Sequence, residues 1–476
     1  MNERRRAVEQ GRTRQELLAK ERIGKLIIRF AVPAVMSFLV NAVYNIVDQI
    51  FIGQSVGMLG NAATNVAFPL TTISTAVALL CGVGTASNFN LEMGRGNPDK
   101  AGNIVGTGIT MLAVSGLVIC AAVLIFLRPL MGAFGATEKV LPYALSYTQI
   151  TAFGIPFAVF ATGGSHLIRA DGSPTFAMIS IASGAVLNIF LDAFFIFGLN
   201  MGIAGAALAT SIGQAVSCCL VIGYLTRFQS IHFTRAHFHL NAGRVWAICS
   251  LGAAACLNQL AMTVVQITMN QTLTYYGALS HYGSDIPLAC VGVISKLNII
   301  LVAFSVGIAQ GCQPIVGFNY GAKNFARVRK TYRLAAIWVT AIATVFFLCF
   351  QLIPHEIIAI FGKGSNEYFE FATRYLRIFM LLTFINGIQP VTSNFFTSIG
   401  KANRGIFISL TRQILFLLPL ILIFPLLWGI DGVMYAGPIA DGVAAVLAFV
   451  FIFFEMRQMK REEEKGRFKN QADPPK

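Results

Sequence analysis

Long apolar segments constrain this chain more than any other feature of its sequence. Ile104 to Phe126 and Leu410 to Leu427 are two examples, and a helix needs about 20 such residues to span a bilayer. The chain is 55% hydrophobic and only 12% charged, with a mean hydropathy of +0.67. A soluble protein of 476 residues would need more charge to cover its surface. We therefore expect an all-α polytopic membrane protein that has the lipid bilayer as a partner.

The apolar segments predict twelve transmembrane helices. The segment 1–25 is charged and lacks an apolar core, so we expect no cleavable signal peptide before the first helix. The predicted helices are 26–52, 61–89, 103–127, 141–167, 175–197, 203–226, 245–277, 286–317, 332–353, 369–398, 405–428 and 433–456.

The distribution of positive charge predicts the orientation. With the N-terminus inside, most lysine and arginine residues fall on the cytoplasmic side: segment 319–333 carries five, while 53–60 and 198–202 carry none. This asymmetry is the positive-inside rule, and it largely explains the net charge of +15. Because the cations are spread over alternate loops, we expect no nucleic-acid partner. Both termini are expected in the cytoplasm, and the protein in the cell membrane.

The sequence contains a weak internal repeat. One constant offset in numbering aligns Gly84 with Gly311, Gly94 with Gly321, and Asn97 with Asn324, and further glycines match later in the chain. Since six predicted helices separate each residue from its equivalent, the two halves have parallel topology. The predicted domains are a cytoplasmic segment (1–25), a first six-helix lobe (26–226), a cytoplasmic linker (227–244), a second six-helix lobe (245–456) and a cytoplasmic tail (457–476).

Polar side chains lie inside the first lobe's apolar helices. In NAVYNIVD, residues Asn41, Tyr44, Asn45 and Asp48 share one helix face. In NIFLD, Asn188 and Asp192 are one turn apart in the fifth helix. These segments place carboxyl groups where a charge is costly.

Helix rise places the two acids at one depth. Asp48 and Asp192 each lie roughly 8–9 Å below the outer end of their helix, and Thr210 of the sixth helix lies at roughly 10 Å. No lysine or arginine lies in either acid-bearing helix at that depth. A carboxylate without a nearby cation is compensated by a proton or by a hard cation such as Na⁺. The alternative is that each carboxylate merely accepts hydrogen bonds and fixes helix packing.

The second lobe carries charges whose roles the sequence leaves open. Lys296 and Asp441 both lie below the outer edge, so they could form a structural ion pair, or Lys296 could face a cavity. Arg412 could snorkel to the interface or pair inward. The nine cysteines have no metal-ligand spacing, and we find no nucleotide-binding motif or nucleophile–base pair. We expect neither an enzyme nor a cofactor.

Several motifs together resemble one family. The run PAVMSFLVNAVYNIVDQIFIG, the N-x-x-x-D of the fifth helix and QGCQPIVGFNYGAKN are similar to the multidrug and toxic compound extrusion family over roughly residues 25–456. The resemblance implies a V-shaped pair of lobes that exports organic cations in exchange for Na⁺ or H⁺. It also implies an ion site at Asp48, Asn188, Asp192 and Thr210, with Na⁺ possible at the first three, and a bend at Pro33.

This chain departs from the family branch that has acids within the seventh and tenth helices. The seventh helix has none, and the tenth has only Glu370 at its outer edge. A second ion site of that kind is not expected, and the chain resembles the DinF/MepA-like branch.

The sequence as a whole favours a monomeric antiporter that exports lipophilic organic cations by alternating access. The competing hypothesis is a flippase for a lipid-linked precursor on a related fold, which would need several cationic residues in its cavity. Flexible thioether groups and aromatic faces suit apolar cations. The expected substrate-binding residues are Met36, Asn41, Tyr44, Phe157, Met178, Met262, Gln266 and Met269.

Overall fold

The computed structural model describes residues 16–283, 285–360 and 365–472, and these residues form helices joined by short connections without any strand. Their first half contains α2 (Ile23–Ser55), α3 (Met58–Gly94), α4 (Pro98–Ile125), α5 (Leu127–Ala133), α6 (Leu141–Ala170), α7 (Pro174–Asp192), η1 (Ala193–Gly198), α8 (Gly202–Leu225) and η2 (Arg235–Phe238). The second half contains α9 (Ala242–Ala278), α10 (Asp285–Gly321), α11 (Phe325–Leu352), α12 (Pro354–Ala359), α13 (Asn366–Phe379), α14 (Thr383–Asn386), α15 (Ile388–Ser398), α16 (Ala402–Leu410), η3 (Thr411–Leu417), α17 (Leu418–Trp428) and α18 (Ile430–Ala472).

Eleven helices of the described chain are long and apolar enough to cross a membrane. The predicted helix 369–398 is the exception, because it is broken into α13, α14 and α15. Gly387 lies at the second break, where a Cβ would stand 1.9 Å from the Cγ1 of Val339 on α11. Broken helices are tolerated at membrane depth when protein surrounds them. This segment meets that condition because Phe379 and Ile388, beside the breaks, are buried.

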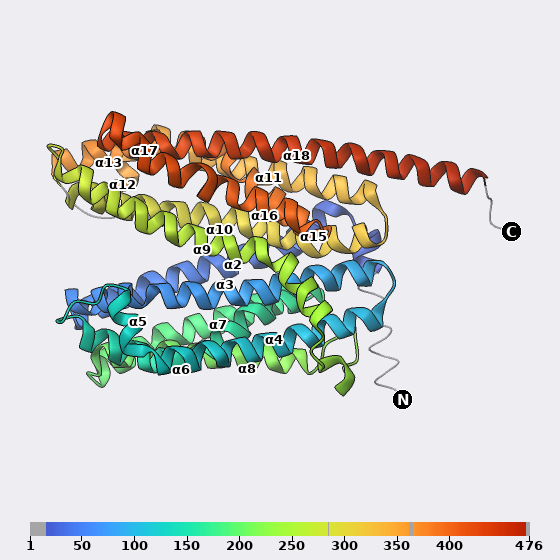
Figure 1. Ribbon diagram of the computed structural model, residues 1–476, viewed down its shortest axis with the longest axis horizontal. Helices are drawn as coiled ribbons and strands as arrows, with labels where there is room; N and C mark the ends of the chain where they lie inside the picture. Colours follow the sequence, from blue (N-terminus) through green and yellow to red (C-terminus); the bar gives the residue numbers. More distant parts are fainter. Residues whose placement is uncertain (1–15, 284, 361–364, 473–476) are drawn as a thin grey trace.

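The helices form two lobes, as the sequence predicts. Helices α2 to α8 make the first lobe, which lies in the lower part of Figure 1. Helices α9 to α18 make the second lobe, which lies mainly in the upper part. Packing is extensive within each lobe, for example between α6 and α8 and between α17 and α18. Contact between the lobes comes mainly from α2 and α3 of the first with α9 and α10 of the second.

The backbone confirms the internal repeat. Gly202, the first residue of α8, has a φ of +57°, and its equivalent Gly429, just before α18, has a φ of +58°. Gly96 has a φ of +78° after α3, and its equivalent Lys323 has a φ of +57° after α10. A lysine in this left-handed region is uncommon. It therefore shows that the turn geometry is retained where the glycine is not.

The lobes pack closely at the end of the bundle where the described chain begins at Glu16 and ends at Ala472, which we call the terminal end (Figure 1). A Cβ on Gly252 of α9 would stand 1.9 Å from the carbonyl oxygen of Leu80 on α3. Only glycine allows this approach, as in other helix pairs within membranes. The glycines that contact the opposite lobe in this way, which we call the interlobe glycines, are Gly84, Gly94, Gly252, Gly307, Gly311 and Gly321.

Two of the interlobe glycines, Gly94 and Gly321, obey the same twofold relation as the repeat. Gly94 meets Phe318, and its equivalent Gly321 meets Leu91, the residue equivalent to Phe318. Polar contacts support the seam: Arg169 Nη1 of α6 donates to Gln310 Oε1 of α10 at 3.0 Å. The terminal end is therefore closed by direct contact between the lobes.

The N-terminal segment also contributes to this closure. Arg327 Nη2, at the start of α11, donates to the carbonyl oxygens of Leu18 at 3.0 Å and Glu21 at 2.7 Å. These bonds tie the chain before α2 to the second lobe.

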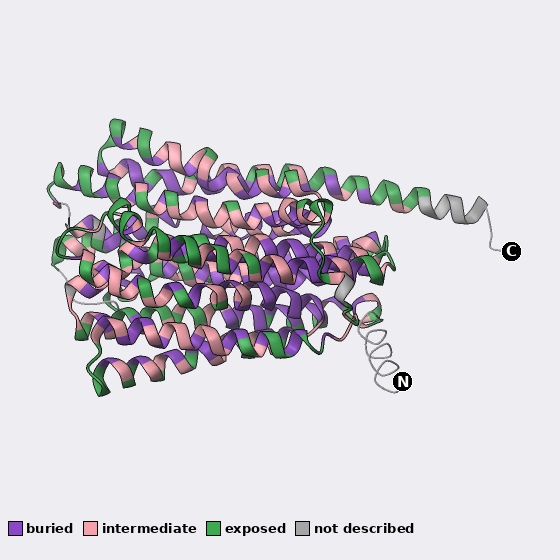
Figure 2. Ribbon diagram, turned by 60° about the horizontal axis from the view of Figure 1, so that its bottom comes forward, coloured by how far each residue is buried: buried purple, intermediate pink, exposed green. Residues whose placement is uncertain are grey.

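The lobes diverge toward the opposite end, which we call the far end. Buried residues concentrate toward the terminal end in Figure 2, and exposed or half-buried residues dominate away from it. Val43 and Ile50 of α2 and Val264 and Ile267 of α9 are exposed in the far halves of these two helices. The result is a V that is open at the far end.

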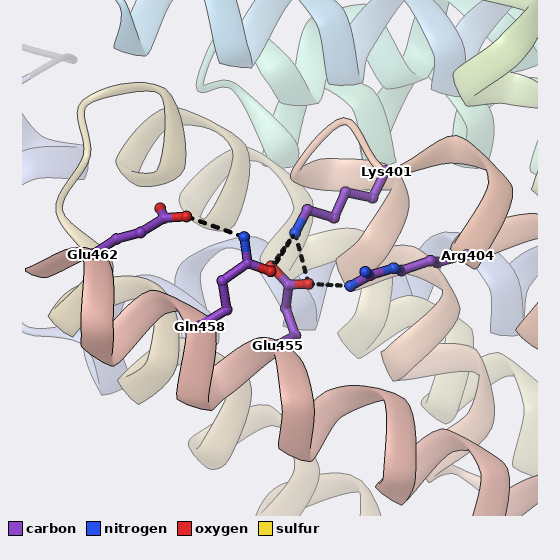
Figure 3. Close-up of polar contacts among 5 residues, drawn as sticks. All are labelled: Lys401, Arg404, Glu455, Gln458 and Glu462. Carbon is purple, nitrogen blue, oxygen red and sulfur yellow. Dashed lines mark hydrogen bonds and ion pairs between the residues drawn. The ribbon is translucent and has the colours of Figure 1, made fainter.

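Ion pairs hold the last helix against the second lobe. Glu455 of α18 is buried and accepts from Lys401 Nζ at 2.6 Å and from Arg404 Nη1 at 2.5 Å (Figure 3). The pairs fix α18 to the start of α16 and to Lys401 just before it, at the terminal end.

Helix α2 runs from Ile23 to Ser55 with Pro33 inside it, so the expected bend at Pro33 does not interrupt the helix. The Ser37 hydroxyl donates to the Pro33 carbonyl oxygen at 2.8 Å. A hinge at Pro33 stays a prediction.

Candidate functional site

Two acidic side chains are buried together in the first lobe. Asp48 lies in the far half of α2 and is 8% exposed, and Asp192 ends α7 and is fully buried. Because α2 packs along α7, the two side chains come within hydrogen-bonding contact of each other. One oxygen of each, Oδ1, has no hydrogen-bond partner among the described residues.

Asn188 and Thr210 complete the group. Asn188 lies one turn before Asp192 on α7, and Thr210 faces it from α8. With the amide oriented to satisfy both of its ends, Asn188 Nδ2 donates to Asp192 Oδ2 at 3.1 Å and Oδ1 accepts from the Thr210 backbone N–H at 3.0 Å. The structure therefore brings together all four residues of the predicted ion site.

No basic side chain is among the groups that act on these acids in the described part of the chain. Two carboxylates in contact repel each other, so they cannot both be ionised unless a cation joins them. A shared proton would satisfy the pair. A hard metal cation would suit it equally, because carboxylate, amide and hydroxyl oxygens are the ligands such cations prefer. The donor set thus fits either ion.

Sequence reasoning missed one neighbour of the pair. Tyr147 of α6 lies near both Asp48 and Asp192, as does Tyr44 of α2. Nothing in the local sequence around Tyr147 signals this position, because it depends on how α6 packs against the other helices.

A cavity of about 280 Å³ opens beside the acids within the first lobe. Asn188 and Thr210 line it, so it reaches the ion-site residues, and Gln259 of α9 borders it from the second lobe. No charged side chain of the described residues lines the cavity. Many hydroxyl and amide groups share its wall with apolar residues, and they include Thr71, Thr75, Thr151, Thr162, Gln214 and Ser217.

The predicted substrate-binding residues do not share one site: some line the cavity, some are exposed or half-buried elsewhere, and one is buried in a hydrophobic core. Asn41 and Tyr44 line the cavity. Met36 and Phe157 are exposed, and Met178, Met262 and Gln266 are half-buried. Met269 instead lies in the hydrophobic core of the second lobe, where its Sδ accepts from the Tyr375 hydroxyl at 3.6 Å. Its surroundings are those of a packing residue.

The sequence left two options for Lys296, and the first of them, an ion pair with Asp441, is wrong. Asp441 Oδ1 accepts instead from Nε of Arg412, and Asp441 Oδ2 accepts from Asn386 Nδ2 at 3.4 Å. Lys296 is exposed on α10 and has no ion pair within the described residues. Arg412 therefore pairs inward with Asp441 and does not snorkel to the membrane interface. The sequence suggested this pair because Lys296 and Asp441 lie at similar depths in the membrane. The rotation of α10 about its axis instead leaves the Lys296 side chain exposed and away from Asp441.

Two helical lobes that diverge as a V, with a buried acidic pair in one of them, form an architecture suited to membrane transport by alternating access. The comparison with known proteins is consistent with this. The MatE family profile matches residues 33–194 and 254–423. The chain belongs to the MatE family.

Its relatives and structural neighbours are transporters. The multidrug export protein MepA of Staphylococcus haemolyticus (strain JCSC1435) is 26% identical over 439 residues, which cover 91% of this chain and 94% of that protein. The structure of the MATE multidrug transporter DinF-BH in complex with R6G is 33% identical, with a TM-score of 0.84 over 91% of this chain and 96% of that one. A transporter of Pyrococcus furiosus has the same fold, with a TM-score of 0.86, 22% identity, and coverage of 93% of this chain and 98% of that one.

Proposed function

We propose that this protein exports lipophilic organic cations across the cell membrane in exchange for H⁺ or Na⁺. The observation that carries the coupling is the buried contact between Asp48 and Asp192, which has no basic partner among the described residues. Such a pair must take up a cation when it is buried and must release it when water or a substrate changes its surroundings. Asn188 and Thr210 supply the remaining polar contacts.

The proposed mechanism is alternating access between the two lobes, acting as a monomer. We take the terminal end as cytoplasmic, because the loops there carry most of the positive charge. The seam of interlobe glycines then closes the cytoplasmic side while the V opens outward. Exchange would require this seam to separate, which breaks the Arg169–Gln310 bond.

Two features support a cationic substrate. The relatives include proteins named as multidrug exporters. The first lobe offers two acids and a cavity lined by uncharged residues, and Asn41 and Tyr44 are among them. In contrast, the flippase hypothesis needs cations in the cleft. Because Arg412 is neutralised by Asp441, that hypothesis retains only Lys296 of its two candidates.

Efflux from proteoliposomes tests the proposal. A fluorescent lipophilic cation is loaded, and a pH gradient or a Na⁺ gradient is imposed separately to identify the coupling ion. Asp48→Asn and Asp192→Asn should each abolish uphill efflux while the protein still folds. Asp99→Asn, which changes an exposed acid at the start of α4, is the matched control and should transport normally. Uphill efflux at the unmodified rate in either site variant would refute the assignment.

A further inference from the structure

The internal repeat lets each polar residue of the second lobe be matched with a position in the first. The offset is 228 between Gly172 and Gly400, which both have positive φ, and 227 between Gly202 and Gly429. Arg412 lies between Gly400 and Gly429 and is thus equivalent to residue 184 or 185. Asp441, after Gly429, is equivalent to residue 214.

The equivalent residues of the first lobe line its cavity. Gly184, Ala185 and Gln214 are all part of the cavity wall. Asn386, which contacts Asp441, is equivalent to residue 158 or 159, and Ala158 is also part of the wall. The Arg412, Asp441 and Asn386 group therefore occupies, in the second lobe, the place that the first lobe keeps as a cavity.

The two lobes neutralise their buried acids in different ways. Asp441 is 3% exposed and Arg412 is 9% exposed, and the two side chains form a direct ion pair. Arg412 lies in η3, a π-helical turn, and such turns are often found at functional sites. In the first lobe, small residues stand where Arg412 would be, and Asp48 and Asp192 have no basic partner within the described chain. A buried acid with a fixed guanidinium needs no further cation, whereas the acidic pair does.

We propose that Arg412 is a specificity-determining residue that acts as a built-in counter-cation. It occupies the second lobe's equivalent of the first-lobe cavity and prevents Asp441 from taking up a coupling cation. Transport is thereby coupled through the first lobe alone. This inference rests on the proposed function, because it presumes that Asp48 and Asp192 take up the coupling ion.

Counting bound cations tests the inference. The purified full-length protein is titrated with radioactive Na⁺, or its proton release on substrate binding is measured, and the number of cations per protein is determined. We expect one in the unmodified protein and two in Arg412→Met, because Asp441 then lacks its partner. Arg412→Met/Asp441→Asn is the matched control and should return to one.

A second variant keeps the test decisive if Arg412→Met does not fold. Asp48→Asn/Asp192→Asn leaves the second lobe intact and should bind no coupling cation. A residual cation that is lost on adding Asp441→Asn would overturn the inference, as would a folded Arg412→Met that binds only one. A third outcome separates this inference from the proposed function. If the number of bound cations is unchanged in Asp48→Asn/Asp192→Asn and also unchanged when Asp441→Asn is added, the proposed ion site in the first lobe is refuted. The same result still shows that Asp441 binds no cation.

Discussion

The seam of interlobe glycines offers the most direct test of alternating access. In Gly252→Ala, the new methyl group would stand 1.9 Å from the Leu80 carbonyl oxygen, whereas ordinary van der Waals contact begins at 3.4 Å. Helices α3 and α9 would have to move apart by the difference between these two distances. Because the obstacle is backbone, no side chain can turn away to relieve it. Overpacking of this kind costs about 1–3 kcal/mol.

This overpacking destabilises only the conformation in which the seam is closed, because α3 and α9 are no longer in contact once the seam is open. The equilibrium should therefore shift toward the state open at the terminal end, by a factor of about 5 to 150. Transport should slow in consequence, since the outward-open state becomes less populated.

Cysteine labelling measures the shift. Cys312 is buried on α10, next to the interlobe glycine Gly311, and it can be kept while the other eight cysteines are changed to serine. A membrane-impermeant maleimide applied from the terminal side should label Cys312 faster in Gly252→Ala. Gly223→Ala, at a helix glycine with nothing within 4 Å of a Cβ, is the control. Equal labelling in the two variants, with efflux at the unmodified rate, would refute the role of the seam.

Three further predictions concern other parts of the molecule. Gln310→Glu should strengthen the seam, because a carboxylate would form an ion pair with Arg169 in place of a hydrogen bond from the guanidinium to a neutral amide; Cys312 labelling should slow, and it should quicken in Gln310→Ala. Asp441→Asn should destabilise the protein by about 3–5 kcal/mol in chemical denaturation, because it leaves Arg412 buried without its partner; Arg412→Met/Asp441→Asn should recover much of this, and additive losses would argue against the pair. Structurally unrelated lipophilic cations should compete for efflux while anionic dyes of similar size do not, and an anion exported better than its cationic counterpart would favour the flippase.

Much of the architecture follows from the sequence alone. Apolar segment length predicts the membrane helices because the bilayer thickness fixes how many residues a span needs. Helix rise places Asp48, Asp192 and Thr210 at one depth, and the structure does bring them together. The constant offset between matching glycines predicts the two related lobes, because equivalent turns need the same backbone conformation, as at Gly202 and Gly429.

Only the tertiary structure decided which side chains meet. Depth is a one-dimensional quantity, so it could not distinguish Lys296 from Arg412 as the partner of Asp441; the rotation of each helix about its axis made that choice. The breaks within 369–398 likewise depend on neighbours such as Val339 that surround the chain there. The Tyr147 position and the hydroxyl-lined cavity arise where several helices of one lobe converge. Contacts of this kind depend on packing between distant segments, which no local pattern of residues encodes.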